Sequence, residues 1–405
     1  MASTQPQFLS FSSETLMPQE ERIEIGRKKQ ELFIGIPKET EFMEKRIALA
    51  PDAVEVLVSH GHQIRVESGA GEHASFSDKE YSDAGAEICY NSDKIFEANT
   101  ILKVHPPTLD EIGLMKSKQT LISALQLKIQ DDRYFKALMN KHVSAIAFDY
   151  MRDDDGIIPV VRSMSEIAGN TAILIAAELM SNANNGKGLM LGGISGVGPT
   201  DVVILGAGTV GEFACRAALG LGAQVKVFDK SLTRLRRLQN DLHQRIATSV
   251  LQPKVLEKAL KRADVVIGAI RADEGRTPCV VTEEMVQQMK PGSVVIDVSI
   301  DQGGCLETSE ITTHERPTFK KFEVVHYGVP NIASRVARTA SLSLSNIFMP
   351  ILMSAGEYGG IDAMVRFNRG LREGLYMYNG VLTNKGIGEW YKLPWKNLDL
   401  LLAAM

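Results

Sequence analysis

VVILGAGTVGEFACRAALGLGAQVKVFD (residues 202–229) decides the fold of this 405-residue chain. Gly206, Gly208 and Gly211 form a GxGxxG motif directly after a strand-like apolar run and at the start of a helical pattern. The first glycine suits a tight turn, the second lets the backbone approach a pyrophosphate, and the third lets helix and strand pack closely. Asp229 ends the next strand-like run, where a carboxylate accepts both ribose hydroxyls and repels a 2′-phosphate. The motif therefore predicts a dinucleotide site that favours NAD over NADP.

Apolar runs alternate with helical patterns on both sides of this motif. Strands are expected at 32–36, 63–67, 100–104, 120–125, 143–150, 201–208, 223–229, 263–270, 293–300 and 322–329. Helices are expected at 51–61, 131–142 and 165–182, and again after residue 330. Strands that alternate with helices predict parallel sheets covered on both faces.

The chain is long enough for two domains. Its clearest composition shift is the glycine-rich stretch NNGKGLMLGGISGVGPT (184–200), so a domain boundary is expected near it. Residues 1–30 are polar and then charged, which is typical of an extension; we expect a surface or subunit-contact helix there.

Composition excludes several function classes. A net charge of −4 argues against nucleic acid or an anionic membrane as partner. The four cysteines (Cys89, Cys215, Cys279 and Cys305) form no CxxC pair, which fits a reducing cytoplasm, and the eight histidines show no metal-binding spacing, so no metal is expected. The N-terminus lacks a secretory pattern, and no apolar run is long enough to predict a membrane span.

In a dinucleotide-binding sheet the nicotinamide lies past the carboxyl ends of the later strands. Those ends carry Ala269 and Ile270, Ile300 and Asp301, and Asn331. Asp301 opens the sequence DQGG, whose glycines bring the backbone close to a ligand. Asp301 and Asn331 are also typical of helix or turn caps, and that interpretation stays open.

Several ordered segments together resemble the family of alanine dehydrogenases and the soluble NAD(H)-binding part of proton-translocating nicotinamide nucleotide transhydrogenases. The likeness runs from Phe33 to about Ser354 and is carried by residues 34–62, 69–71, 163–169, 188–212, 289–308 and 312–319. The resemblance implies an α/β fold with two Rossmann-like, doubly wound parallel-sheet domains and a cleft between them. It places the substrate domain at residues 31–164 plus 331–405, and the NAD-binding domain at 165–330.

The resemblance also implies a reaction and a set of roles. Hydride would pass between NAD and an amino acid, through an iminium that water opens to pyruvate and ammonia, in a homo-oligomer that is a hexamer or dimer. Arg46 falls on the arginine that grips the substrate carboxylate, Asp301 on an aspartate next to the reacting water, and Asn331 on an asparagine beside nicotinamide and substrate. Ser165 falls on a serine near the cofactor phosphates, although it is also a candidate helix cap. Val210 lies within the GxGxxG motif and is a further candidate for cofactor binding.

Two positions depart from the family. Where its dehydrogenases read Lys-Val-Lys-Glu-Pro, this chain has His105 in place of the second lysine, which contacts substrate. The family's acid/base histidine falls on Gln126, which cannot relay a proton near pH 7. Loss of such a group costs about 10²–10⁴ in rate.

Three interpretations of His105 stay open. It has taken over the acid/base role, since imidazole titrates near neutral pH. Alternatively, alanine chemistry is weak or absent and the pocket accepts another amino or keto acid, or none. Finally, His105 merely ends its strand.

The sequence thus favours a cytoplasmic NAD-dependent amino-acid dehydrogenase of the alanine dehydrogenase type. Arg46 would hold the carboxylate, His105 and Asp301 would handle protons and water, and Gln126 would only position the substrate. One rival is an opine- or saccharopine-like oxidoreductase that joins an amine to a keto acid. Another is an NAD(H)-binding subunit without catalysis.

Overall fold

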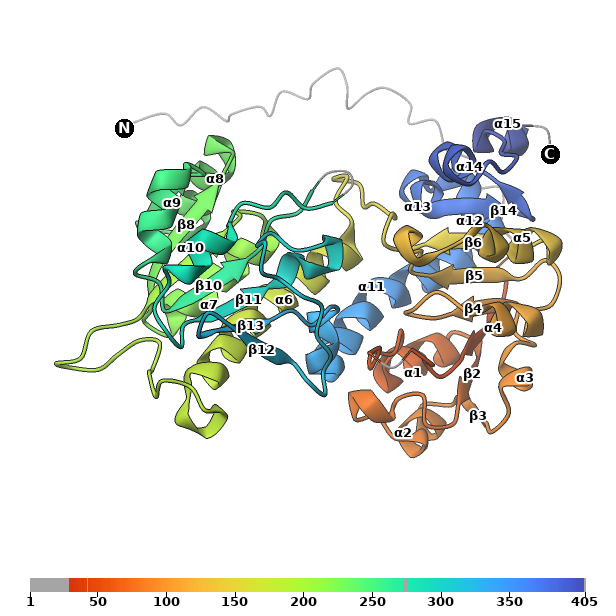
Figure 1. Ribbon diagram of the computed structural model, residues 1–405. Helices are drawn as coiled ribbons and strands as arrows, with labels where there is room; N and C mark the ends of the chain where they lie inside the picture. The colour runs from red at the N-terminus through yellow and green to blue at the C-terminus, as the bar shows by residue number, and fades with distance from the viewer. Residues whose placement is uncertain (1–28, 42, 273–275, 404–405) are drawn as a thin grey trace, which may run out of the picture.

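Two helix-flanked sheets make up the computed structural model, which describes residues 29–41, 43–272 and 276–403. Figure 1 shows a seven-stranded sheet and an eight-stranded sheet side by side, with helix α11 (Ala337–Glu357) running between them. The α/β class predicted from the alternating pattern is confirmed. The helix expected within residues 1–30 falls almost entirely outside the described residues.

The eight-stranded sheet has the order β15-β14-β6-β5-β4-β1-β2-β3. The neighbouring strands from β3 to β6 pair in parallel, and within the described residues β14 pairs antiparallel with both β6 and β15. The strands are β1 (Phe33–Ile36), β2 (Gln63–Glu67), β3 (Glu87–Cys89), β4 (Thr100–Leu102), β5 (Thr120–Ser123), β6 (Ser144–Ala147), β14 (Leu375–Tyr378) and β15 (Val381–Leu382). The central strands are buried along their whole length, as expected for a parallel sheet covered on both faces.

The seven-stranded sheet has the order β12-β13-β11-β10-β7-β8-β9, and only β12 is antiparallel to its neighbour. Its strands are β7 (Asp201–Leu205), β8 (Gln224–Asp229), β9 (Ala247–Val250), β10 (Val265–Gly268), β11 (Val294–Asp297), β12 (Thr318–Lys321) and β13 (Val324–Tyr327). Counted along the chain, the six parallel strands of each sheet lie in the order 3-2-1-4-5-6. Each sheet therefore has a switch point between its first and fourth strands, where doubly wound folds bind ligands.

Helices cover both faces of the sheets. They are α1 (Pro51–Ser59), α2 (Asp78–Asp83), α3 (Ser92–Ile95), α4 (Leu109–Leu114), α5 (Asp132–Asn140), α6 (Pro159–Met180), α7 (Thr209–Gly220), α8 (Leu232–Leu242), α9 (Pro253–Leu260), α10 (Glu283–Gln287), α11, α12 (Ile361–Phe367), α13 (Arg369–Gly374), α14 (Lys385–Tyr391) and α15 (Leu398–Ala403). The helix expected from residue 165 begins earlier, at Pro159, because proline suits the first helical position.

Several sequence predictions were wrong in detail. The strands expected at 143–150, 201–208, 263–270 and 322–329 are shorter, and span Ser144–Ala147, Asp201–Leu205, Val265–Gly268 and Val324–Tyr327. The strand expected at 293–300 ends at Asp297, whose carboxylate accepts the Ser299 amide at 3.0 Å and turns the chain into a short 3₁₀ helix, Val298–Gln302. The chain after residue 330 is not purely helical, because β14 and β15 return to the edge of the eight-stranded sheet. β14 reads LYMY and is fully buried, so no alternation marks it as a strand.

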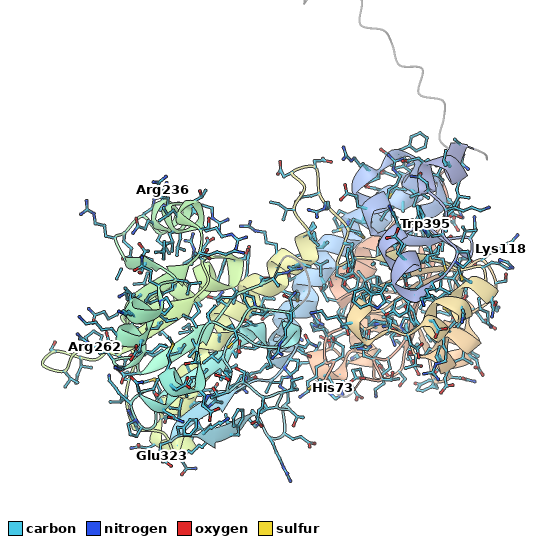
Figure 2. All side chains as sticks on the ribbon, turned by 45° about the horizontal axis from the view of Figure 1, so that its top comes forward. His73, Lys118, Arg236, Arg262, Glu323 and Trp395 are labelled. Atoms are coloured by element: carbon cyan, nitrogen blue, oxygen red, sulfur yellow. The ribbon has the colours of Figure 1, made fainter. Side chains whose placement is uncertain are left out.

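One helical stretch, Ile332–Glu357, is long and apolar enough to cross a membrane by length and composition alone, and a core helix passes the same test. In this fold α11 packs against α1, α6 and α12 between the two sheets. Its buried face includes Leu344 and Phe348, which belong to the core of the eight-stranded half. Figure 2 shows Lys118 and Trp395 on the outside of that half, and Arg236 and Arg262 on the outside of the other.

Candidate active site

The glycine loop lies at the switch point of the seven-stranded sheet, after β7 and beside β10. A Cβ on Gly206, whose φ is +113°, would come within 2.3 Å of the Ala269 carbonyl oxygen. A Cβ on Gly211 would lie 1.9 Å from the Gly206 carbonyl oxygen. A Cβ on Gly208, by contrast, would meet no atom of the described chain within 4 Å. Two glycines thus serve the fold, and the third leaves open space at the start of α7, where a pyrophosphate fits against the helix N-terminus.

Gly208 therefore offers a direct test of dinucleotide binding. We expect Gly208→Ala to fold like the wild type and to raise the dissociation constant of NADH by roughly 10²-fold. The reason is that a methyl group displaces the phosphates from charge-assisted hydrogen bonds worth about 1.5–3 kcal/mol each. Fluorescence titration with NADH measures the affinity, and thermal unfolding checks the fold. Gly113→Ala, which also adds a Cβ to open space, is the control; unchanged NADH affinity of Gly208→Ala would contradict the assignment.

Asp229 ends β8 beside the glycine loop. Its Oδ2 accepts the Ala207 amide at 2.7 Å, and its Oδ1 accepts the Ser231 amide at 2.7 Å. The side chain is buried at 4% exposure, but each oxygen keeps a lone pair. The carboxylate is thus fixed at the loop edge with capacity for ribose hydroxyls.

Helix α6 packs against the first turn of α7, next to the glycine loop. A Cβ on its Gly169 would lie 2.4 Å from the Val210 carbonyl oxygen, so α6 and the first turn of α7 touch through their backbones. Ser165 stands one turn before Gly169 and so lies on the same face. Its hydroxyl donates to the Val161 carbonyl at 2.7 Å, so Ser165 lies inside the helix and does not cap it.

The strand ends beyond the loop contribute mainly backbone. The Ile270 amide donates to the Ser299 hydroxyl at 3.0 Å, and the Ala269 amide donates to the Leu205 carbonyl of β7 at 2.8 Å. Ile300 is 4% exposed, so its side chain belongs to the core. Ala269, Ile270 and Ile300 therefore border the site without presenting polar side chains.

The segment that carries Arg46 is attached to α11 and to the short 3₁₀ helix that precedes it, Ile332–Val336. Backbone amides of residues 45, 47 and 50 donate to three buried serine hydroxyls at 2.6–2.9 Å. The pairs are Lys45 with Ser334, Ile47 with Ser341, and Ala50 with Ser345. Each hydroxyl satisfies an amide that would otherwise be buried without a partner. This attachment fixes the backbone position of Arg46 relative to α11.

Arg46 is held by a neighbouring carboxylate. Its Nε and Nη2 donate to Glu44 at 2.7 and 2.5 Å, and the side chains are 11% and 1% exposed. Burial alone would raise the pKa of Glu44, but the charge and hydrogen bonds of Arg46 bring it below its ordinary value. No acceptor among the described residues bonds Nη1, so the Nη1–Nη2 edge of the guanidinium stays available for a second carboxylate.

Asn331 joins Arg46 to Asp301. Its Nδ2 donates to Glu44 at 2.9 Å, and its backbone amide donates to Asp301 Oδ1 at 3.1 Å. Asn331 adopts a left-handed conformation with φ +54°, which directs its side chain toward Glu44 instead of capping the helix that follows. Burial raises the pKa of Asp301, although the Asn331 amide and the charge of Arg46 act against it. The structure thus brings three predicted residues together: Arg46, Asp301 and Asn331.

His105 follows β4 at the switch point of the eight-stranded sheet. Its Nδ1 lies 3.1 Å from the Pro106 carbonyl oxygen, a geometry that assigns the ring proton to Nδ1 and leaves Nε2 as an acceptor. Burial lowers the pKa of His105 below its ordinary value, while the charges of Glu41 and Glu44 oppose this. His105 is therefore mainly neutral at pH 7 and lies within electrostatic reach of Glu44, the partner of Arg46.

Gln126 occupies a different environment. It is left-handed with φ +45°, and the Asp149 carboxylate accepts the amides of Leu125, at 3.0 Å, and of Gln126. Burial raises the pKa of Asp149, and the charge of Arg271, which follows β10 of the other sheet, opposes it. Among the described residues no hydrogen bond or ion pair joins Gln126 to Arg46 or His105.

Sequence reasoning missed three parts of this arrangement: Glu44, Glu39 and the serine attachments. Glu44 lies two residues before Arg46, and that spacing was an available signal. Glu39 accepts the amides of Val104 and His105, contacts between residues more than 60 positions apart that no local pattern encodes. The described residues contain no group of three His, Cys, Asp or Glu side chains that could hold a metal ion.

Comparisons with known proteins agree with this geometry. The family model for the alanine dehydrogenase/PNT N-terminal domain matches residues 35–168, and that for the C-terminal domain matches residues 172–385. Alanine dehydrogenase of Methanococcus maripaludis is 38% identical over 90% of this chain and 98% of its own length. Alanine dehydrogenase 2 of Staphylococcus aureus is also 38% identical, over 90% of this chain and 98% of its own length.

Solved structures extend the comparison to the fold. An L-alanine dehydrogenase superposes with a TM-score of 0.83 at 34% identity, covering 89% of this chain and 99% of its own. A transhydrogenase from Sinorhizobium meliloti superposes with a TM-score of 0.76 at 25% identity, and the match covers 87% of this chain and 99% of the transhydrogenase chain. The resemblance inferred from the motifs is confirmed. The chain belongs to the alanine dehydrogenase/PNT family.

Proposed function

We propose that this chain oxidises L-alanine with NAD⁺ and water to pyruvate, ammonia and NADH, and catalyses the reverse reaction. The observation that carries the proposal is Arg46, whose guanidinium is buried, oriented by Glu44 and open along one edge beside Asn331 and Asp301. That edge suits an α-carboxylate, and relatives with 38% identity are named alanine dehydrogenases. NAD, which the glycine loop, Asp229 and Ser165 would hold, supplies the hydride acceptor.

The charge and hydrogen-bonding capacity of each residue set its role in the proposed reaction. Arg46 binds the substrate carboxylate and fixes Cα relative to the carboxyl ends of the strands. Neutral His105 accepts a proton at Nε2 from the alanine ammonium group and releases it to solvent. It then accepts a proton from the water that adds to the iminium and returns it to the amino group, which leaves as ammonia while the new hydroxyl loses its proton to His105. Asp301 orients that water, and Asn331 holds Asp301 and Glu44 in place. Gln126 is left with a positioning role, because its amide cannot relay a proton.

The domain division expected from the sequence remains part of this proposal. The substrate domain would comprise residues 31–164 and 331–405, and residues 165–330 would bind NAD. The boundary then falls inside α6, a rigid helix that packs against α7 and α11. Closure of the two halves would exclude water from the reacting atoms.

A homo-oligomer is also proposed, on the evidence of one projecting segment. Residues 188–199 extend away from the seven-stranded sheet (Figure 1, far left), and Met190, Ile194 and Val197 are each more than 60% exposed there. Exposed apolar side chains on a projecting segment are typical of subunit contacts. We expect Ile194→Asp to reduce the molecular mass measured by light scattering, and Leu232→Asp, at a similarly exposed position on α8, to leave it unchanged. An unchanged mass for Ile194→Asp would contradict this contact.

A cytoplasmic location fits the thiols. All four cysteines are free, and three of them are buried. Free thiols persist in a reducing compartment. We therefore propose a soluble cytoplasmic enzyme.

The function is tested by NADH oxidation with pyruvate plus ammonium, run beside a panel of larger and dicarboxylic keto acids with ammonium or amino acids. We expect pyruvate with ammonium to be the best pair. Arg271 favours the opine-like rival, because its exposed guanidinium could bind a second carboxylate. Preference for a dicarboxylic or amine-joined substrate would select that rival. Tight NADH binding without turnover of any pair would select a non-catalytic subunit.

A further inference from the structure

Glu39 links two strand ends at the switch point of the eight-stranded sheet. It follows β1, and its Oε1 accepts the Val104 amide at 2.6 Å while its Oε2 accepts the His105 amide at 3.2 Å, both just after β4. β1 and β4 are neighbours whose chain connections leave in opposite directions. A single carboxylate therefore holds the backbone from which the His105 imidazole projects.

The surroundings of Glu39 are buried and charged. The Lys103 ammonium, 1% exposed, lies 3.7 Å from Glu39 Oε2 and 2.6 Å from Glu111 Oε1. Glu44 and Arg46 act on the same carboxylate from the segment after β1. Counting Glu39, Glu44 and Glu111 against Lys103 and Arg46 leaves one negative charge when all are ionised. Lys103 is thus shared between two acids, and Glu39 has no full counterion of its own.

We propose that Glu39 is a positioning residue that couples the carboxylate-binding and proton-transfer sides of the substrate site, by fixing the His105 backbone and by adding its charge to the field around Arg46. This rests on the proposed function and goes beyond it, because it assigns a role to a residue that touches neither substrate nor cofactor.

The charge of Glu39 changes near neutral pH. Burial, with the nearby Glu44, raises its pKa to about 7 although Lys103 opposes this. Below that pH the carboxyl is protonated, and the positive charge of Arg46 is less compensated. Above it the ionised carboxylate adds negative charge next to the bound substrate anion. The KM for pyruvate is therefore expected to rise as the pH increases through about 7.

Two substitutions of Glu39, to Gln and to Asp, together separate the effect of its charge from the effect of its hydrogen bonds. Glutamine can accept one of the two amides, but its NH₂ group then faces the other N–H, so the backbone of His105 must shift. Misplacement of a catalytic group by about 1 Å costs up to 10²-fold, so we expect kcat to fall 10–100-fold. The KM for pyruvate should lose its dependence on pH near 7. Glu39→Asp keeps the charge and can reach one amide, so it should retain the pH dependence and recover part of kcat.

Glu111→Gln is the matched control. It removes a charge from the same lysine, holds no part of the His105 backbone, and keeps the capping box of α4, since glutamine also suits that position. Its kcat should stay within threefold of the wild type. Thermal unfolding and NADH titration of each variant show whether it is folded.

Two further measurements keep the inference apart from the proposed reaction. Calorimetric titration of pyruvate into the enzyme–NADH complex without ammonium measures binding and needs no turnover. We expect the wild type and Glu111→Gln to bind pyruvate more weakly above pH 7, and the affinity of Glu39→Gln to be independent of pH. That result would support the inference even if alanine chemistry fails. A folded Glu39→Gln with wild-type kcat and unchanged pH dependence would overturn it. Equal effects of Glu39→Gln and Glu111→Gln would also overturn it, because the lysine environment alone would then explain both.

Discussion

Replacing Arg46 with lysine is expected to lower kcat/KM for pyruvate by roughly 10²–10⁴-fold while leaving NADH binding unchanged. In the proposed function the guanidinium serves two acids: Glu44 accepts hydrogen bonds from Nε and Nη2, and the substrate carboxylate would bind along the Nη1–Nη2 edge. A lysine ammonium keeps the charge beside Glu44 but cannot present two parallel donors to a second carboxylate. Loss of two charge-assisted hydrogen bonds, each about 1.5–3 kcal/mol, gives the stated range. Most of the loss should fall on KM, because the same carboxylate is bound in ground and transition states.

Arg65→Lys is the matched control for this change. Arg65 lies on β2 of the same sheet and pairs with Glu87 and Glu97, but those acids are about half exposed. Surface pairs of this kind contribute at most about 1 kcal/mol to stability. We expect wild-type kinetics from Arg65→Lys. A kcat/KM for Arg46→Lys within tenfold of the wild type would show that the substrate carboxylate binds elsewhere.

The seven-stranded half was the more predictable part from the sequence, and its geometry explains why. The turn after β7, the helix start at Thr209 and the acid that ends β8 are all close in the chain, so spacing and residue type suffice. Gly206 and Gly211 must be glycines, because an added Cβ would lie 2.3 and 1.9 Å from backbone carbonyl oxygens, and this requirement is visible in the sequence as the GxGxxG spacing. The exact strand ends were less predictable. β11, for example, ends at Asp297, whose carboxylate accepts the Ser299 amide, although the apolar pattern continues to Ile300.

The eight-stranded half depends on contacts between distant segments. Three serines around α11 accept amides from residues 45–50, almost 300 positions away, and serines in an apolar helix carry no local sign of that role. β14 also escaped prediction, because pairing with β6 decides its state and its own residues are uniformly apolar. Arg46 came from family resemblance, and Asp301 and Asn331 came from both their places at strand ends and the resemblance, whereas the role of Glu39 required the fold.

His105→Gln is expected to lower kcat by about 10²–10⁴-fold, the usual loss when an acid/base group is removed. Its Nε2 is an acceptor in the neutral ring, and burial lowers its pKa below the ordinary value. A base must be deprotonated, so alanine oxidation should fall as the pH drops through that lowered pKa. This acid limb should disappear in His105→Gln. His73→Gln, an exposed histidine of the same half (Figure 2), should change neither kcat nor the pH profile.

The partner experiment is the double change Gln126→His with His105→Lys, which restores the residue types usual in the family. Gln126 lies in a left-handed turn whose backbone Asp149 fixes, and no described contact connects it to His105. If His105 has inherited the proton chemistry, the double variant should turn over pyruvate and ammonium no faster than the wild type. If instead the wild type is inert and the double variant is active, His105 is not the base, and the chain has moved to another substrate or to NADH binding alone. Stopped-flow measurement of the single-turnover rate separates these outcomes, since it reports the chemical step without product release.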